Sequence, residues 1–358
     1  MNAFEFFAHC VVNQKVEHCF ALLGDANMQV AATMADLGVT FTYVQHEHCA
    51  VAASMAYARK TKKVGVSTVT CGPGLTQIMT ALPAAVRARI PLVIFAGESP
   101  LGNSWYNQQI EQRPFVEATG ARYIQLHTCK RFEEGIQEAF LIAVRDRLPV
   151  VVGTPFDLLH GDIAELPKNE TPLHEIYRKS VSIPSGKSQE ITNLSALLNV
   201  SRTPIIMAGL GATRPETAQH IALLAEKCDA LLATTLPARG LFHNDPFYLG
   251  VSGGFASQVT RKFLSESDLI VAFGASISSH NSDQQKLWPN ARVIQITLDP
   301  QQFFQGNTVS DQIIVGDAGQ IVAKLLPLIR SKTRVNRTDE TADLIQQTPI
   351  DDSDGLTY

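Results

Sequence analysis

Two short segments of this sequence carry residues that could do chemistry. His46-Glu47-His48 places a carboxylate at a strand-to-helix junction, and Cys71-Gly72-Pro73-Gly74 follows the next apolar run. A carboxylate can hold and return a proton, and two glycines around a proline let a flat ligand approach the backbone closely. Because the loops beyond parallel strands line the ligand crevice of an α/β sheet, we expect both segments to meet at one sheet edge. The sequence therefore predicts a cofactor site there.

Each segment also has a simpler interpretation. Glu47 lies in the first turn of its expected helix, where the macrodipole favours a carboxylate by about 0.3–1 kcal/mol. The Gly72-Pro73-Gly74 stretch could be a plain tight turn. His46 and His48 do not share a helix face, and no third ligand follows at metal spacing, so we expect no metal site. The functional interpretation therefore depends on the elements around these segments.

Those elements follow a strand-then-helix rhythm, which is typical of a parallel sheet with helices on both faces. The first part predicts strands over 18–23, 40–44, 64–69, 91–96, 122–126 and 149–153, and helices over 27–37, 47–59, 75–88 and 131–145. The second part predicts strands over 204–208, 230–234, 269–273 and 292–298, and helices over 214–227, 256–264 and 318–329. The predicted fold class is α/β, with two doubly wound parallel-sheet domains.

Breaks in the periodicity give the expected domain organisation. Residues 1–165 form one domain, and a proline-rich, polar stretch over 166–186 is typical of a linker. Residues 187–330 form the second domain, which resembles a Rossmann fold. From 331 to 358 the apolar periodicity stops, so we expect a polar linker or tail there.

Composition excludes several classes of protein. The 358 residues are 45% hydrophobic and 18% charged, which is too apolar for a disordered chain. The net charge is −4 and basic residues do not cluster beyond Lys60, Lys62 and Lys63, so we expect no nucleic-acid partner. Six cysteines without CxxC spacing fit reduced, packed thiols. The N-terminus lacks a basic head with a long apolar stretch, so we expect a cytoplasmic protein without membrane contact.

The order and spacing of several segments are similar to those of a known family. Segments 24–27, 44–50, 56–59 and 70–76 resemble the N-terminal pyrimidine-binding domain of thiamine-diphosphate enzymes such as acetolactate synthase and benzoylformate decarboxylase. Segments 207–212, 234–240, 268–274 and 293–300 resemble the central domain of the same family. The resemblance covers roughly residues 1–330.

The resemblance implies roles for individual residues. In the family, the glutamate that matches Glu47 protonates a ring nitrogen of the aminopyrimidine, which prepares the cofactor to activate its own thiazolium carbon. The implied cofactor is thiamine diphosphate, and the implied substrate is a 2-oxo acid in a lyase or transferase reaction. The implied cofactor-binding residues are Gly24, Thr70, Gly72, Pro73, Gly74 and Gln77, and weaker matches at Asp25, His46, Gln109 and Gln112 suggest substrate contacts.

The sequence also departs from the family pattern. Leu23 stands where relatives usually have proline, and Gln77 replaces a usual asparagine. Residues 109–112 match only loosely the Gln/Glu pair that relatives place near the substrate. Where acetolactate synthases carry a Gly-x-His-Gly segment for FAD, residues 250–254 read GVSGG, so FAD is not expected. Substrate choice therefore stays open.

The largest departure concerns the diphosphate. Relatives bind it through Mg²⁺ on a third domain marked by Gly-Asp-Gly and a later Asn-Asn, and this sequence lacks that pair. We therefore expect Mg²⁺ to bind only through a domain that this chain does not carry. In the family, the pyrimidine domain of one subunit faces the diphosphate domain of another, so the resemblance implies a homo-oligomer with its site between subunits. The alternative is a non-catalytic relic of the family that binds a ligand or acts as a scaffold.

Overall fold

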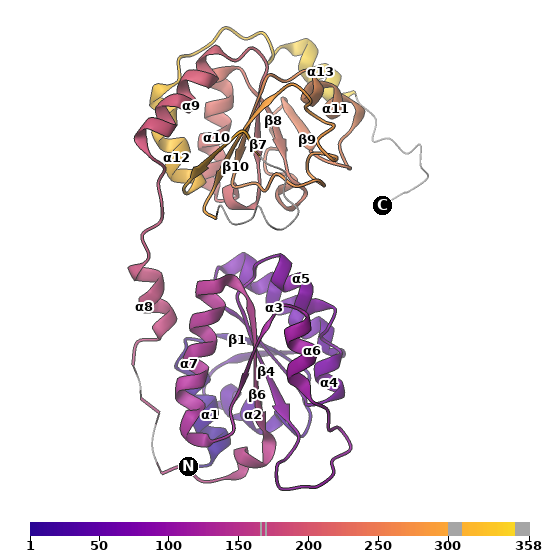
Figure 1. Cartoon of the computed structure of the whole chain (residues 1–358), viewed down its shortest axis with the longest axis vertical. Coiled ribbons are helices and arrows are strands. Elements are labelled where there is room, and N and C mark those ends of the chain that lie inside the picture. The colour runs from indigo at the N-terminus through magenta and orange to yellow at the C-terminus, as the bar shows by residue number, and fades with distance from the viewer. Residues whose placement is uncertain (165–166, 169, 300–309, 348–358) are drawn as a thin grey trace. The chain divides into compact units, whose positions relative to one another are not determined.

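The computed structural model describes residues 1–164, 167–168, 170–299 and 310–347. The chain forms two compact units, Met1–Val181 and Ser182–Tyr358 (Figure 1). Each unit contains a six-stranded sheet in which all pairings are parallel, with helices on both faces. This confirms the predicted α/β class with two doubly wound sheets.

The sheet of the first unit has the strand order β2-β1-β3-β4-β6-β5. Its central strands β3, β4 and β6 are buried along their whole length, which explains their continuous apolar runs. The strands are β1 (His18–Ala21), β2 (Thr40–Tyr43), β3 (Gly65–Val69), β4 (Leu92–Glu98), β5 (Arg122–Gln125) and β6 (Pro149–Pro155).

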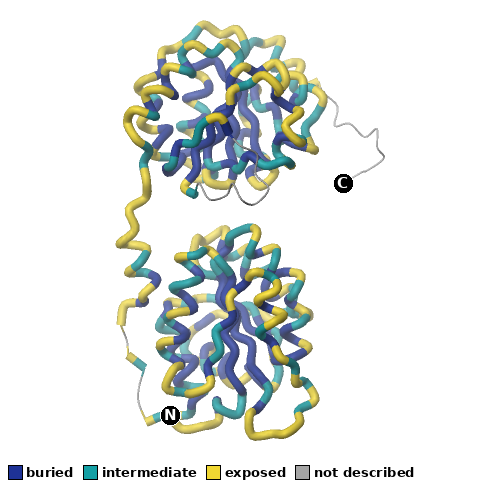
Figure 2. The backbone as a smooth tube through the Cα atoms, in the orientation of Figure 1, coloured by how far each residue is buried: buried dark blue, intermediate teal, exposed yellow. Residues whose placement is uncertain are grey.

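Two hydrophobic clusters pack the helices of this unit onto the sheet. One joins a sheet face to α1, α2 and α7, and the other joins the opposite face to α3, α5 and α6. Figure 2 shows the buried strands inside and the exposed outer faces of the helices. The helices are α1 (Ala3–Val12), α2 (Met28–Asp36), α3 (Glu47–Thr61), α4 (Pro73–Thr76), α5 (Ala81–Arg87), α6 (Gln112–Ala118), α7 (Phe132–Ile142) and α8 (Leu173–Ser180). The single helix predicted over 75–88 is thus two helices, α4 and α5.

The second unit has the strand order β12-β11-β10-β7-β8-β9. Helices α9, α10 and α12 cover one face, and α11 and α13 pack with a second cluster on the other. The strands are β7 (Pro204–Ala208), β8 (Leu231–Thr234), β9 (Tyr248–Val251), β10 (Leu269–Phe273), β11 (Arg292–Thr297) and β12 (Gln312–Val315). The helices are α9 (Ser188–Val200), α10 (Pro215–Cys228), α11 (Gln258–Ser265), α12 (Ala318–Leu325) and α13 (Asp339–Gln346).

The stretch expected to be a linker over 166–186 contains the helix α8. Within α8, His174 is buried and its ring lies 5.5 Å from the ring of Phe140 on α7. This contact attaches α8 to the first unit. His174 is the buried residue of this otherwise mostly polar helix. The expected domain boundary at 165 and 166 lies outside the described residues.

The expected tail after residue 330 is an ordered part of the second unit as far as it is described. Asp229 accepts hydrogen bonds from the backbone amides of Val335, Asn336 and Arg337, and the Arg337 guanidinium pairs with Asp245 at 2.9 Å. These polar contacts, rather than an apolar period, fix the segment. Residues 348–358 of the expected tail, and residue 300 of the matched segment 293–300, lie outside the described residues.

Within the described part of the chain, none of the helices is both long and apolar enough to cross a bilayer.

Candidate functional site

The candidate site lies where the strand order of the first sheet reverses. Strand β1 pairs with β2 on one side and with β3 on the other, so the loops after β1 and β3 leave the sheet edge side by side. Ligands of open α/β sheets bind at such a switch point. The loop after β1 carries Gly24 and Asp25. The loop after β3 carries Thr70 to Gly72 and leads into α4 at Pro73, and α3 follows β2.

A buried asparagine fixes the loop after β1. The Asn27 amide oxygen accepts from the backbone amide of Gly24 at 2.8 Å, and its amide nitrogen donates to Leu22 O and Thr68 Oγ1 at 3.0 Å each. Thr68 Oγ1 donates in turn to Phe95 O at 3.0 Å. The loop is therefore held in place against β3 and β4.

Thr70 fills the space between the two loops. A Cβ atom on Gly24 would lie 2.7 Å from Thr70 Oγ1, and one on Gly74 would lie 2.7 Å from Thr70 Cγ2. Both positions therefore need glycine. The Thr70 hydroxyl is buried and has no hydrogen-bond partner of suitable geometry among the described residues.

Gly72 begins the Gly-Pro-Gly turn in a conformation that only glycine adopts easily, with φ +58°. A Cβ atom there would come within 1.9 Å of Gln108 O. The Gly72 amide donates to Gln112 Oε1 at 2.8 Å, and the neighbouring Cys71 thiol donates to Gln108 Oε1 at 3.4 Å. Burial raises the pKa of the Cys71 thiol, so this donor keeps its proton.

Glu47 is the first residue of α3, and it faces the same turn. His46 caps the helix, because its Nδ1 accepts from the backbone amide of His48 at 3.1 Å. A Cβ atom on Gly74 would lie 3.4 Å from Glu47 Oε1, which places the carboxylate next to the turn. The Glu47 side chain is half-buried. The structure thus brings the carboxylate and the Gly-Pro-Gly turn together, as the sequence analysis expected.

Other residues singled out in the sequence lie differently. Pro73 opens α4 and is exposed, and Gln77 is exposed at the end of that helix. The three residues Asp25, His46 and Gln109 are exposed on loops or helix starts of the same unit. Gln112 is only 3% exposed, and its amide binds Gly72, Gly97 and Tyr123, so the structure uses it inside the protein rather than at a surface.

Sequence reasoning missed a buried carboxylate, Glu98. Glu98 ends β4, accepts from Tyr123 Oη at 2.5 Å, and accepts from Gln125 Nε2 at 2.9 and 3.0 Å. Burial and the Glu98 charge raise the pKa of the Tyr123 hydroxyl. A charged residue at the end of an apolar strand was the available signal, since such ends border the ligand crevice.

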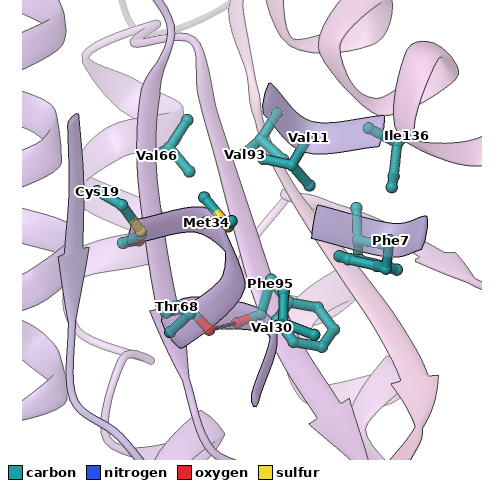
Figure 3. A pocket seen from close by; sticks show the side chains of 13 residues that line it. Phe7, Val11, Cys19, Val30, Met34, Val66, Thr68, Val93, Phe95 and Ile136 are labelled. Carbon is teal, nitrogen blue, oxygen red and sulfur yellow. Dashed lines mark hydrogen bonds between the residues drawn. The ribbon is translucent and has the colours of Figure 1, made fainter. Parts of the chain in front are cut away.

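The first unit also contains an enclosed cavity of about 20 Å³, which is not the candidate site. Figure 3 shows its lining, with Phe7, Val30 and Ile136 from helices facing Val93 and Phe95 of the sheet. This volume holds about one water molecule and no cofactor. It lies on the face covered by α1, α2 and α7, whereas α3 with Glu47 packs on the other face.

Among the described residues, no three histidine, cysteine or carboxylate side chains come close enough to hold a metal ion.

Comparison with known proteins gives two matches of the same kind. A family described as "Thiamine pyrophosphate enzyme, N-terminal TPP binding domain" matches residues 1–116. A second, "Thiamine pyrophosphate enzyme, central domain", matches residues 191–325. The chain belongs to the thiamine pyrophosphate enzyme family. The first match contains Gly24, Glu47 and the Gly72-Pro73-Gly74 turn, whereas Tyr123 lies beyond it.

Acetolactate synthases are similar to this thiamine pyrophosphate enzyme chain over nearly its whole length. The large subunit from Buchnera aphidicola subsp. Schizaphis graminum is 27% identical over 95% of this chain and 60% of its own length. The isozyme 3 large subunit from Escherichia coli is 27% identical over 97% of this chain and 61% of its own. The probable acetolactate synthase large subunit from Methanocaldococcus jannaschii is 26% identical over 91% of this chain and 56% of its own length. The chain thus spans about 60% of the length of the curated relatives it matches.

Proposed function

We propose that this chain supplies the catalytic glutamate and the pyrimidine site of a thiamine-diphosphate-dependent, acetolactate-synthase-like enzyme. The substrate would be a 2-oxo acid, and the reaction a decarboxylation or carboligation. The observation that carries the proposal is the Glu47 carboxylate beside Gly74, at the switch point of the first sheet. The similarity to acetolactate synthases supports the reaction class.

The residues present fit the pyrimidine part of thiamine diphosphate. The turn from Gly72 to Gly74 places an exposed proline between two buried glycines, next to a half-buried carboxylate. The Thr70 methyl group packs against Gly74 of this turn, and its buried hydroxyl lies beside Gly24. A flat ring bearing nitrogen atoms could lie against the turn and reach the Glu47 carboxylate. When bound, thiamine diphosphate supplies a nucleophilic carbon and an electron sink.

Glu47 is the residue we expect to handle a proton. Its position at the start of α3 places it beside the turn, and the His46 cap holds the first turn of that helix. A carboxylate held beside the turn can share a proton with a ring nitrogen of the ligand and take it back later. Gly24, Thr70 and Gly74 would shape the floor of the site.

The proposal also covers the Mg²⁺ ion and a partner subunit. The resemblance to the family supports binding of Mg²⁺ and the diphosphate by a diphosphate domain outside the described residues. Large apolar side chains are exposed on the same sheet edge, at Leu23, Tyr43, Leu101 and Trp105. Exposed apolar surface of this kind favours cover by another protein surface. We therefore propose a homo-oligomer with its site between subunits. The sequence GVSGG at 250–254, in place of a Gly-x-His-Gly segment, supports the further proposal that the chain binds no FAD.

Binding and turnover of the Glu47→Gln variant test the proposal. Calorimetry with thiamine diphosphate and Mg²⁺, and carbon dioxide release from pyruvate, are measured for the purified chain alone and with cell extract. We expect Glu47→Gln to fold normally and to reduce turnover by about 100-fold or more, as expected for loss of a general acid–base group. The matched control is Glu216→Gln, an exposed acid in the first turn of α10.

Two outcomes would contradict the proposal. If Glu47→Gln turns over as fast as the unmodified chain, Glu47 is not the catalytic glutamate. If the unmodified chain neither binds thiamine diphosphate nor supports turnover with extract, the non-catalytic ligand-binding or scaffolding alternative is the better interpretation.

A further inference from the structure

A buried side chain holds the Gly-Pro-Gly turn from behind. Gln112 is the first residue of α6 and is 3% exposed. Its Oε1 accepts from the Gly72 amide at 2.8 Å, and its Nε2 donates to Gly97 O at 3.0 Å and to Tyr123 Oη at 3.1 Å. One amide group therefore connects the turn after β3 to the end of β4 and to β5.

The partners of this amide allow only one orientation. A backbone N–H can only donate, and a backbone carbonyl can only accept. The Gly72 N–H therefore requires the Gln112 oxygen, and the Gly97 carbonyl requires the Gln112 nitrogen. A flipped amide would lose both hydrogen bonds in a buried environment, where each unpaired group costs about 1–3 kcal/mol.

Tyr123 and Glu98 complete the arrangement. Tyr123 Oη accepts from Gln112 Nε2 and donates to Glu98 Oε1, while Gln125 Nε2 donates to both Glu98 oxygens. Gly153 of β6 leaves room for them, since a Cβ there would lie 2.1 Å from Tyr123 Oη and 2.7 Å from Glu98 Oε1. Every donor in this chain of contacts has an acceptor.

We propose that Gln112 is a positioning residue that holds the Gly72–Gly74 turn beside Glu47, and that Tyr123 and Glu98 fix the orientation of its amide. The inference rests on the proposed function, because it assigns a task in the same site. Because Gln112 is buried, we assign it no direct contact with the expected ligand. It acts through the Gly72 amide, and therefore through the distance between Gly74 and Glu47.

Loss of the Gln112 side chain should affect mainly the Gly72–Gly74 turn. Without an acceptor, the Gly72 N–H is left unpaired in a buried place, and the turn is favoured to move until water reaches it. Gly74 then moves relative to Glu47 and Thr70. The rest of the sheet keeps its own hydrogen bonds, so the effect should be local.

Isotope labelling can isolate the Gly72 amide. Cys71-Gly72 is the sole Cys-Gly pair in the sequence, so ¹³C-carbonyl cysteine with ¹⁵N-glycine gives one carbonyl-linked NMR signal, from Gly72. In the 358-residue chain we expect Gln112→Met to raise the hydrogen-exchange rate of Gly72 by about tenfold or more, because its buried hydrogen bond is lost. Gln112→Glu keeps an oxygen acceptor for Gly72 but loses the donor to Gly97 O, so it should raise the rate by less than Gln112→Met does and shift the signal downfield.

Controls separate positioning from general damage. Gln258→Met changes an exposed glutamine that also opens a helix, α11, and should leave the Gly72 signal unchanged. The remaining ¹⁵N-glycine signals report whether each variant is folded. If Gln112→Met does not fold, Tyr123→Phe removes only the hydroxyl and should raise Gly72 exchange by about threefold or more.

Several results would overturn the proposal. An unchanged Gly72 exchange rate in folded Gln112→Met would do so, as would equal effects of the methionine and glutamate variants, or no effect of Tyr123→Phe. The measurement needs no cofactor. A chain that protects Gly72 through Gln112 but fails to bind thiamine diphosphate would therefore contradict the proposed function while leaving the Gln112–Gly72 contact intact.

Discussion

Gly74 and Glu47 approach each other so closely that an alanine Cβ at position 74 would lie 3.4 Å from Glu47 Oε1. The same Cβ would lie 2.7 Å from Thr70 Cγ2, which is closer than real Cβ atoms come to their neighbours. The contact with Glu47 is ordinary, whereas the contact with Thr70 is a clash. Glycine at 74 is therefore required by Thr70, and its proximity to the carboxylate follows from that packing.

Gly74→Ala is expected to destabilise the first unit by about 1–3 kcal/mol, because it adds a methyl group to a filled space. It should also weaken thiamine diphosphate binding, since either Thr70 or the turn must move. Urea unfolding followed by hydrogen-exchange mass spectrometry reports each unit separately. Gly102→Ala is the matched control, because a Cβ there meets only Asp157 Oδ2 at 3.5 Å. Equal stability of the two variants would show that Thr70 yields without cost.

Arg337→Met is expected to destabilise the second unit by about 3–5 kcal/mol, the usual effect of leaving one partner of a buried ion pair alone. Arg337 is 7% exposed, donates to Ala230 O and both Asp245 oxygens, and lies 4.4 Å above the Phe247 ring. Thermal unfolding of the variant gives the size of the effect.

The exposed pair Arg334–Glu226 provides the control for that prediction. Its side chains are 61% and 53% exposed, so Arg334→Met should cost less than about 1 kcal/mol. Adding Asp245→Asn to Arg337→Met should recover part of the lost stability. If Arg337→Met loses less stability than Arg334→Met, residues 331–347 do not stabilise the second unit.

Most of the fold could be predicted from the sequence, because buried parallel strands leave continuous apolar runs such as those of β3, β4 and β6. The strands that were missed, β9 and β12, are four residues long and lie at sheet edges, where only part of each is buried. Helix α8 and residues 331–338 were missed for another reason. Helix α8 is held through His174, and residues 331–338 through contacts of Asp229 and Arg337, and such isolated polar residues leave no periodic pattern.

The site was predictable only in part. Glu47 and the Gly72–Gly74 turn stand out because a carboxylate and paired glycines follow successive strands. Gln112 was singled out as a possible substrate contact, but its buried partners Gly72, Gly97 and Tyr123 come from distant parts of the chain. Such a network depends on side-chain geometry that strand and helix patterns do not encode.

Thiol labelling should single out Cys49. It is exposed in the first turn of α3, whereas Cys10, Cys19, Cys71 and Cys228 are buried. Cys129 is half-buried, and desolvation raises the pKa of its thiol. Burial raises the pKa of Cys10 and of Cys228 to about 12, so these thiols stay protonated and unreactive. Iodoacetamide at pH 8 should add one fast adduct, seen by intact mass, which Cys49→Ser removes. A fast adduct at a buried cysteine would contradict the packing of that region.

The attachment of α8 should depend on pH through His174. Burial, together with the positive charge of Arg178, lowers the pKa of His174 to about 4, while Glu175 acts weakly in the opposite direction. The unfolded histidine has the higher pKa of 6.5 and binds its proton first as the pH falls. Stability is therefore constant above the unfolded pKa and is lost as the pH falls toward the folded one.

We expect the thermal midpoint of the unmodified chain to fall between pH 6.5 and pH 4 by more than that of His174→Leu, because leucine packs on Phe140 without titrating. His160→Leu changes an exposed histidine of the same unit and should keep the pH dependence of the unmodified chain. Circular dichroism melts between pH 6.5 and pH 4 measure the thermal midpoints of the unmodified chain and of the two variants. If His174→Leu and the unmodified chain lose stability in parallel, the acid sensitivity belongs to other groups, and α8 is held by its backbone contacts rather than by a neutral imidazole.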